Sequence, residues 1–264
     1  MPFKTSSIAL LILGGMLFFQ LSIASDGDYG AVYTLRPLPP PEEYGNVLID
    51  RISTNKGVKP VTFSHWLHRR KFTCRVCHTD LEFNMKVNTT EITEADNRAG
   101  RYCGACHNGR IAFRANGNCE KCHNGNIAYS AEKFAEFQQK PYPTTPFGNW
   151  INWGESLNRG MISPARQLKQ RPQDIPFNKT LILESEWSIV SPAIFPHKAH
   201  VEWLDCSSCH PDIFNIKKKT TKHFSMDAIL DGKFCGVCHL NVAFPINHCQ
   251  GCHPAIKEKE QRKW

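Results

Sequence analysis

The clearest hydrophobic pattern lies at the start of the chain, where residues 8–21 form a nearly unbroken apolar run. Lys4 precedes this run and Ser22-Ile23-Ala24 follows it. A charged start, an apolar centre and small residues at the end are typical of a secretory signal peptide, and the run is somewhat short to cross a bilayer. We therefore predict a signal peptide at 1–24 that is cleaved before Ser25. An uncleaved membrane anchor is the alternative.

Beyond residue 24, the pattern of apolar and polar residues predicts only short elements. Mixed apolar runs at 47–52 and 180–184 predict two short strands, each followed by a histidine-containing stretch for which we expect a short helix. Four prolines between positions 37 and 41 predict an extended, polyproline-like arm at 25–46. The last residues, 257–264, form a charged tail. The chain therefore needs something other than long helices or wide sheets to fold around.

The twelve cysteines supply that feature, because all of them belong to one motif, Cys-x-x-Cys-His, that occurs six times. The motif is the attachment signature of c-type haem, in which two thioether bonds anchor the porphyrin and the adjacent histidine supplies one axial ligand. Zinc sites and disulfides also use paired cysteines, but neither needs a histidine directly after every pair. We therefore predict six covalently bound c-type haems.

The residues that this prediction assigns fall into two sets. The thioether cysteines are Cys74, Cys77, Cys103, Cys106, Cys119, Cys122, Cys206, Cys209, Cys235, Cys238, Cys249 and Cys252. The proximal iron ligands are His78, His107, His123, His210, His239 and His253.

An internal repeat becomes visible when the sequence is shifted by 132 residues, the distance from Cys74 to Cys206. The shift places Phe63-Ser-His65-Trp-Leu-His68 on Phe195-Pro-His197-Lys-Ala-His200, and it superimposes two successive Cys-x-x-Cys-His motifs without an insertion. The third motif of each half follows with a length difference of two residues. The chain therefore divides into two modules of three motifs each, module 1 at 47–125 and module 2 at 179–256.

The segment between the modules, 126–178, is rich in both proline and aromatic residues. Phe134 and Phe137 share one face of a helix that we expect between Ser130 and Gln139, ahead of Pro141. Later prolines predict irregular structure for the remainder. The other aromatic residues are Tyr142, Phe147, Trp150 and Trp153. We expect them to cover haem edges or to stack between the modules, a partner-binding surface being the alternative.

The order Phe-x-His-x-x-His, followed by three Cys-x-x-Cys-His motifs, resembles the three-haem cytochrome c7 proteins of the class III cytochrome c family. The resemblance covers both modules and implies a haem-dominated multihaem cytochrome c fold. Such a fold has little regular secondary structure, with short α-helices and a few short β-strands in two tandem trihaem c7-like modules. Macrocycles rather than side chains would fill most of its core, and the apoprotein would be largely unfolded.

The resemblance also implies the second axial ligands of four haems. In the family, the first histidine of the pair serves the first haem and the second serves the middle haem. Carried over to module 1, His65 serves the haem at Cys74 and Cys77, and His68 serves the haem at Cys103 and Cys106. Their counterparts in module 2 are His197 and His200.

The second ligand of the third haem in each module stays open. Module 2 offers His223 and Met226 in the region before its second motif, and we favour Met226. The aligned residues of module 1, Glu91 and Glu94, are poor iron ligands. The remaining candidates are Met85, Met161, His223 or His248 reaching across from module 2, and an iron left open.

An iron with two strong protein ligands can only accept and donate an electron. We therefore predict a hexahaem electron carrier with no catalytic residues, not an enzyme. Its partners would be redox proteins, namely an inner-membrane quinol-oxidising complex and other multihaem cytochromes. The alternatives are a self-assembling filament subunit and a multihaem reductase with one open iron.

The expected compartment is the periplasm or the outer cell surface, because bacteria attach haem covalently outside the cytoplasmic membrane. The formal charge of +8 would otherwise suggest a nucleic-acid partner. The propionates of six haems would offset this charge, so we predict no binding to nucleic acid.

Overall fold

The computed structural model describes residues 35–168, 176–185, 190–215 and 225–256. The predicted signal peptide at 1–24, the first part of the arm, His223 and the charged tail at 257–264 lie outside the described residues. Among the helices of the described ranges, none combines the length and the apolar character that a bilayer span requires.

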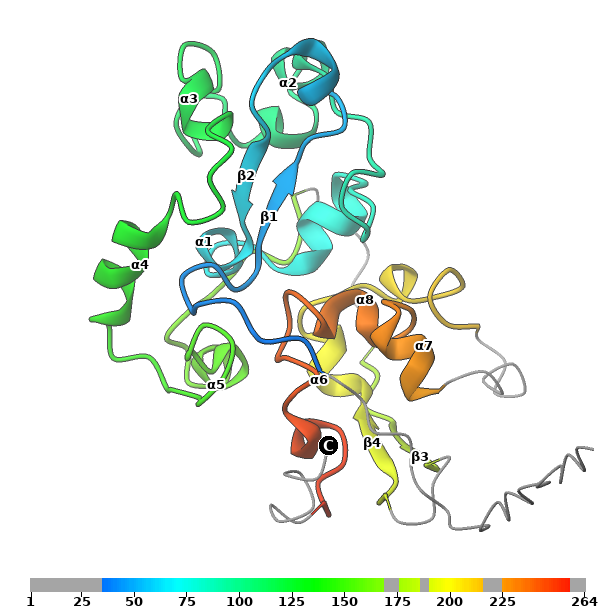
Figure 1. Ribbon diagram of the computed structural model, residues 1–264. Coiled ribbons are helices and arrows are strands. Elements are labelled where there is room, and N and C mark those ends of the chain that lie inside the picture. The colour runs from blue at the N-terminus through cyan, green and yellow to red at the C-terminus, as the bar shows by residue number, and fades with distance from the viewer. Residues whose placement is uncertain (1–34, 169–175, 186–189, 216–224, 257–264) are drawn as a thin grey trace, which may run out of the picture. The chain divides into compact units, whose positions relative to one another are not determined.

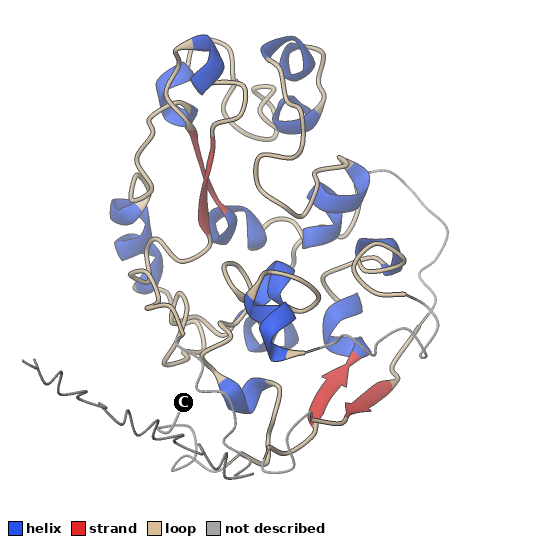
Figure 2. Ribbon diagram, turned by 45° about the vertical axis from the view of Figure 1, so that its right-hand side comes forward, coloured by secondary structure: helices blue, strands red, loops and turns tan. Residues whose placement is uncertain are grey.

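The regular elements are short, and turns and loops connect them over most of the chain (Figure 2). The four strands are β1 (Asn46–Ile49), β2 (Val61–Ser64), β3 (Thr180–Leu183) and β4 (Ala193–Pro196). The α-helices are α1 (His65–Arg69), α2 (Glu94–Arg98), α3 (Cys119–Cys122), α4 (Ala131–Gln138), α5 (Trp153–Asn158), α6 (His197–Val201), α7 (Met226–Leu230) and α8 (Gly236–His239). The short 3-10 helices are η1 (Thr54–Lys56), η3 (Tyr102–Ala105), η4 (Cys206–Ser208) and η6 (Cys249–Gly251), and η2 (Val76–Asp80) is a π-helical turn.

Each module begins with an antiparallel hairpin that runs directly into a short helix (Figure 1). In module 1, β1 pairs with β2 so that Val47 lies opposite Phe63, and α1 follows. In module 2, β3 pairs with β4 so that Leu181 lies opposite Phe195, and α6 follows. Both strands and both helices predicted from the sequence are confirmed. The hairpin therefore sets the start of the helix that carries the histidine pair.

The segment between the modules contributes most of a side-chain core. Five of the six clustered buried residues come from it, and Trp66 of α1 is the sixth. The core residues are Trp66, Phe134, Phe137, Ile151, Trp153 and Ile162. Phe134 and Phe137 lie on α4, which forms within the predicted range. The expectation of irregular structure after residue 141 was wrong for α5, whose first turn is capped by Asn152 accepting the amide of Glu155 at 3.0 Å.

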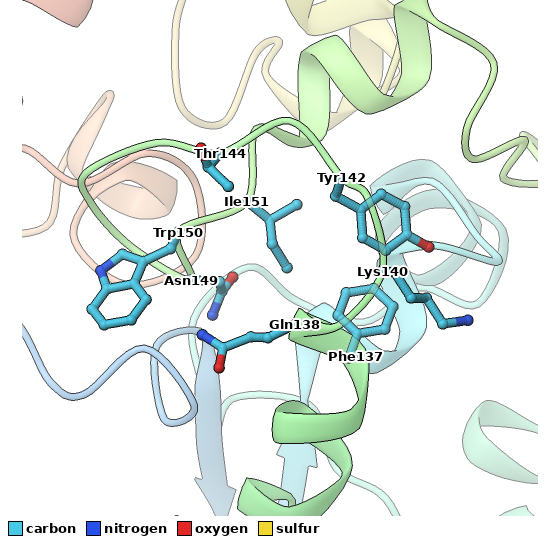
Figure 3. Close-up of a pocket in the computed structure, with 8 residues that line it drawn as sticks. All are labelled: Phe137, Gln138, Lys140, Tyr142, Thr144, Asn149, Trp150 and Ile151. Atoms are coloured by element: carbon cyan, nitrogen blue, oxygen red, sulfur yellow. The ribbon is translucent and has the colours of Figure 1, made fainter.

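The aromatic residues of this segment have different surroundings. The ring centroids of Tyr142 and Trp153 lie 4.9 and 5.9 Å from that of Phe137, so both rings join the core. Phe147 stacks on His248 of module 2 with centroids 4.2 Å apart. Trp150 is half exposed and lies across a shallow pocket from Phe137 and Tyr142 (Figure 3). Of the four, Phe147 stacks on a side chain of a module in the predicted way.

The end of the arm, from Pro40 to Tyr44, forms a turn and not the extended conformation that its prolines predict. The carbonyl oxygen of Pro40 accepts hydrogen bonds from the amides of Glu43 and Tyr44, at 2.9 and 3.0 Å, and so closes a turn. The turn buries Tyr44, and Asn149 donates to the Tyr44 carbonyl at 2.6 Å. Burial of one aromatic ring thus accounts for the bend in a proline-rich stretch.

A buried hydroxyl pair joins β2 to the start of α4. Ser64 Oγ and Ser130 Oγ lie 2.7 Å apart, so the hydroxyl of Ser130 bonds to Ser64 and not to the helix that it precedes. We expect Ser64→Ala to lower the free energy of unfolding of the haem-loaded protein by about 1–2 kcal/mol, because the Ser130 hydroxyl is left unpaired. The Ser64→Ala/Ser130→Ala double variant should recover part of this loss in denaturant unfolding. Strictly additive effects would show that the two hydroxyls do not interact.

Candidate haem sites

The Cys-x-x-Cys-His motifs fold as single tight turns. In five of the six motifs the amide of the histidine donates to the carbonyl of the first cysteine, at 2.7–2.9 Å. Those donors are His107, His123, His210, His239 and His253. The sixth motif, ending at His78, lies on the π turn η2. In these five motifs the spacing of four residues places the first cysteine and the histidine on the same face of the turn.

Ten of the eleven histidines in the described ranges are held by a main-chain carbonyl at Nδ1. The distances from Nδ1 to the carbonyl oxygen run from 2.6 Å to 3.2 Å. The pairs are His65–Gly45, His68–Ser64, His78–Phe83, His107–Phe113, His123–Lys59, His197–Lys179, His200–Pro196, His210–Phe214, His239–Phe244 and His253–Ser191. An Nδ1–H donated to a carbonyl leaves Nε2 as the ring nitrogen with a lone pair, which is the usual arrangement of a metal-binding histidine.

Three of the predicted histidine pairs face one another at a separation that suits one metal ion between them. The ring centroids of His65 and His78 lie 6.5 Å apart, and the two ring planes are within 7° of parallel. The corresponding distance is 6.2 Å for His68–His107 and 6.3 Å for His200–His239. Two metal–nitrogen bonds of about 2 Å, with about 1.1 Å from each Nε2 to its ring centroid, put trans imidazoles about 6.3 Å apart. The residues therefore fit an iron with two axial imidazoles.

His197 takes in module 2 the position that His65 has in module 1. Each is the first residue of its helix. Nδ1 of each donates to the carbonyl of the residue directly before the first strand of the hairpin, which is Gly45 for His65 and Lys179 for His197. Its predicted partner His210 is held by the Phe214 carbonyl at 2.7 Å.

Burial keeps candidate histidine ligands neutral, as binding to iron through a nitrogen lone pair requires. Desolvation lowers the pKa of His65 to about 3 and that of His239 to about 4, so both imidazoles are neutral and can donate a lone pair. Desolvation raises the pKa of Cys77, Cys235 and Cys238 to about 12. Without a bound group, these thiols are therefore uncharged at neutral pH.

Two observations in the described ranges bear on zinc and disulfides as alternatives to haem. No group of three or more His, Cys, Asp or Glu residues there comes together in a way that could hold a metal ion. All twelve cysteines are described, and none of them forms a disulfide. Metal ligation by clustered thiolates and a disulfide scaffold would each need a different arrangement of the same residues.

The phenylalanine of each histidine-pair segment was not recognised as a site residue from the sequence. Phe63 stacks on His68 with centroids 4.4 Å apart and meets His65 edge-on at 4.8 Å. Phe195 repeats both contacts in module 2, at 4.3 Å with His200 and 4.8 Å with His197. One ring therefore orients two candidate ligands in each module. Its recurrence in the 132-residue repeat was the signal that could have identified it.

The described candidate ligands of the third haems have contacts that do not assign any of them to an iron. Met226 is the first residue of α7, and its counterpart Glu94 is the first residue of α2. His248 stacks on Phe147 and meets Phe244 edge-on at 5.8 Å. Met161 is 37% exposed, while Met85 is half-buried. These assignments stay predictions.

Several proteins of known structure are similar to this chain in sequence. A c7-type three-haem cytochrome domain of known structure is 40% identical to this chain over 32% of the chain and 94% of that domain, with a TM-score of 0.27. The C-terminal hexahaem fragment of GSU1996 is 28% identical and matches 82% of this chain and 99% of the fragment, with a TM-score of 0.27. The dodecahaem cytochrome c GSU1996 is 28% identical over 81% of this chain and 48% of its own length, also with a TM-score of 0.27. No curated protein matches.

The family model for cytochrome c7 and related cytochrome c matches twice, at residues 61–124 and 193–254. The two matches fall one in each module and include all six motifs. The chain belongs to this family and is a multihaem c7-like cytochrome built from two tandem modules.

Proposed function

We propose that this protein carries six covalently attached c-type haems and passes electrons between redox partners without acting as an enzyme. The observation that carries the proposal is the spacing of three facing histidine pairs, 6.2–6.5 Å between ring centroids, with Nδ1 of each ring held by a carbonyl. A haem iron supplies reversible one-electron chemistry when bound. The chain's own residues anchor the porphyrin, orient the imidazoles and exclude other ligands.

The proposed ligand set extends these three pairs to the other motifs through the internal repeat and the family resemblance. The six motif histidines are the proximal ligands, while His65, His68, His197 and His200 are the distal ligands of the first two haems in each module. With both axial positions taken by imidazole, these four irons have no place for a substrate. The third haem of each module is the only place where the reductase alternative could have an open iron.

Close spacing of the attachment cysteines supports transfer along the row. After burial, the nearby thiols of Cys74, Cys106 and Cys103 contribute to the raised pKa of Cys77, which links the first two motifs of module 1. Cys122 does the same for Cys103 and links the second motif to the third. In module 2, Cys252 and Cys209 act on Cys235. Successive attachment points of each module are thus electrostatic neighbours.

The location and the partners are further parts of the proposal. The signal-like sequence at 1–24 and the covalent attachment motif support export to the periplasm or the outer cell surface. An inner-membrane quinol-oxidising complex and other multihaem cytochromes are the proposed redox partners, because a chain of bis-imidazole irons needs a donor and an acceptor outside itself.

Intact mass and electron paramagnetic resonance test the proposal together. We expect the purified native protein to have the mass of the chain without residues 1–24 plus six haems, and its oxidised spectrum to be dominated by low-spin ferric signals. A mass with fewer than six haems would contradict the assigned cofactor number. A prominent high-spin signal that changes on adding nitrite would instead favour the reductase alternative.

A further inference from the structure

Arg69 is a cation of module 1 that lies where the two modules meet. Arg69 is the last residue of α1, next to the candidate ligand His68, and its guanidinium donates from Nη2 to the carbonyl of Val242 at 2.8 Å. The same guanidinium lies 5.4 Å from the centroid of the Trp153 ring. No carboxylate forms an ion pair with it among the described residues. A charge of module 1 therefore bonds to the backbone of module 2.

The loop that receives Arg69 follows the second motif of module 2 directly. Its Ala243 carbonyl accepts the hydroxyl of Tyr44 at 2.6 Å. The Asn241 carbonyl lies 3.8 Å from the point where a side chain on Gly45 would begin. Gly45 is also the residue whose carbonyl holds Nδ1 of His65 at 2.7 Å. The loop after His239 thus reaches the backbone that orients a ligand of the first motif in module 1.

A second set of contacts joins module 2 to the first motif of module 1. Thr79 Oγ1, in the turn η2, lies 3.1 Å from Ser208 Oγ in η4. Arg75 forms an ion pair with Asp205 at 3.2 Å, and the Arg75 side chain is 6% exposed. By contrast, the third motif of module 1 contacts β2 of its own module, where the Lys59 carbonyl holds His123. The described contacts therefore join module 2 to the first motif of module 1, although the third is nearest in the sequence.

Arg69 acts on an attachment cysteine of each module. Burial raises the pKa of Cys74, and the nearby Arg69 opposes that rise. Burial likewise raises the pKa of Cys238, with Cys74 adding to the rise and Arg69 again opposing it. One positive charge is therefore within electrostatic range of the first motif of module 1 and the second motif of module 2.

The charge is specific to this junction because the repeat does not duplicate it. The 132-residue shift places Arg69 on Val201, the last residue of α6. An apolar residue at this helix position is therefore compatible with the fold of a module. Its contact with the Val242 carbonyl of module 2 therefore explains the arginine at this position.

We propose that Arg69 is the positioning charge of the junction between the modules, and that it raises the reduction potentials of the haems at Cys74/Cys77 and Cys235/Cys238. The inference rests on the proposed function. A fixed positive charge favours the reduced iron, which has one positive charge fewer than the oxidised iron, and low local dielectric strengthens the effect. The two haems at the junction then hold an electron more stably than they would without this charge.

Spectroelectrochemical titration of Arg69→Gln and Arg69→Val tests the proposal. We expect two of the six haems to shift to lower potential, with the ratio of reduced to oxidised haem at a fixed potential falling at least tenfold, or about 59 mV for one electron. Arg69→Val carries the residue that module 2 has at this position and keeps the test possible if the glutamine variant does not fold. Arg69→Lys, which keeps the charge, should retain most of the wild-type potentials.

Tyr44→Phe is the matched structural control, since it removes a hydrogen bond to the same loop without changing a charge. Its potentials should equal those of the wild-type protein. Equal shifts in the lysine, valine and phenylalanine variants, or no shift in any of them, would overturn the role of the Arg69 charge. Intact mass separates the two levels of failure. Variants with six haems and unmoved potentials contradict only this inference, whereas a wild-type protein with fewer than six haems contradicts the proposed function.

Discussion

Replacing Gly104 or Gly236 with alanine is expected to destabilise the module that contains it by about 3 kcal/mol or more. The two glycines occupy the same place in the second motif of each module, directly after the first cysteine. A Cβ on Gly104 would overlap the Asn97 carbonyl, with its carbon only 2.7 Å away. A Cβ on Gly236 would overlap the Ile229 carbonyl in the same way, with its carbon at 2.9 Å. The backbone of α2 or α7 would have to move away from the motif.

The measurement is thermal unfolding of the haem-loaded protein, followed through the haem absorbance of each variant. Gly154→Ala is the matched control, because a Cβ there meets nothing closer than Asn152 Oδ1 at 3.7 Å and the residue lies inside α5. Alanine at a helical glycine with space for its methyl group should be neutral or stabilising by up to about 1 kcal/mol. If all three variants unfold like the wild type, the close approach of helix and motif is not present in solution.

Replacing His200 with methionine is expected to raise the reduction potential of one haem by roughly 100 mV, a modest part of the ~0.8 V range that axial ligands span. Thioether sulfur is a weaker donor to ferric iron than imidazole, so the oxidised state loses more stabilisation than the reduced state. His200 faces His239 at 6.3 Å, and Phe195 stacks on it, so the substitution changes one ligand in a well-packed position.

Potentiometric titration should show one haem moving while the other five keep their potentials. Lys198→Met places the same side chain on the exposed part of α6 and should leave all six unchanged. A His200→Met protein with six unshifted low-spin haems would exclude His200 as an iron ligand. The aligned variant His68→Met should reproduce the effect in module 1, because His68 faces His107 at 6.2 Å.

Local patterns in the sequence were sufficient to predict much of the fold. The apolar runs ahead of the histidine pairs became β1 and β3, and the face made by Phe134 and Phe137 became α4. These elements depend on residues close together in the chain. The helix α5 was missed because surrounding prolines dominated the pattern, although no proline lies between positions 147 and 163.

The candidate site was predictable as far as residue type and spacing determine it. Which histidines face one another depends on contacts across dozens of residues, and for His65, His68 and His200 the structure has the facing partner that the family resemblance implied. The junction at Arg69 could not be predicted, because its acceptor at Val242 lies 173 positions away and is a main-chain atom. The third-haem ligands have no repeated partner in the two modules, so alignment of the halves gave no answer.

The main-chain carbonyls that accept a hydrogen bond from histidine Nδ1, here called carbonyl clamps, affect how far the sequences of such proteins can diverge. In every clamp the acceptor is an oxygen of the peptide backbone, and it belongs to residues as different as Gly45, Lys59 and Phe83. A point mutation at any of these positions changes the side chain and leaves the acceptor in place. Selection can therefore tolerate drift in the surrounding sequence while the imidazoles keep their orientation, so the two halves can keep their motifs, histidine pairs and the Phe63/Phe195 ring while residues around them differ.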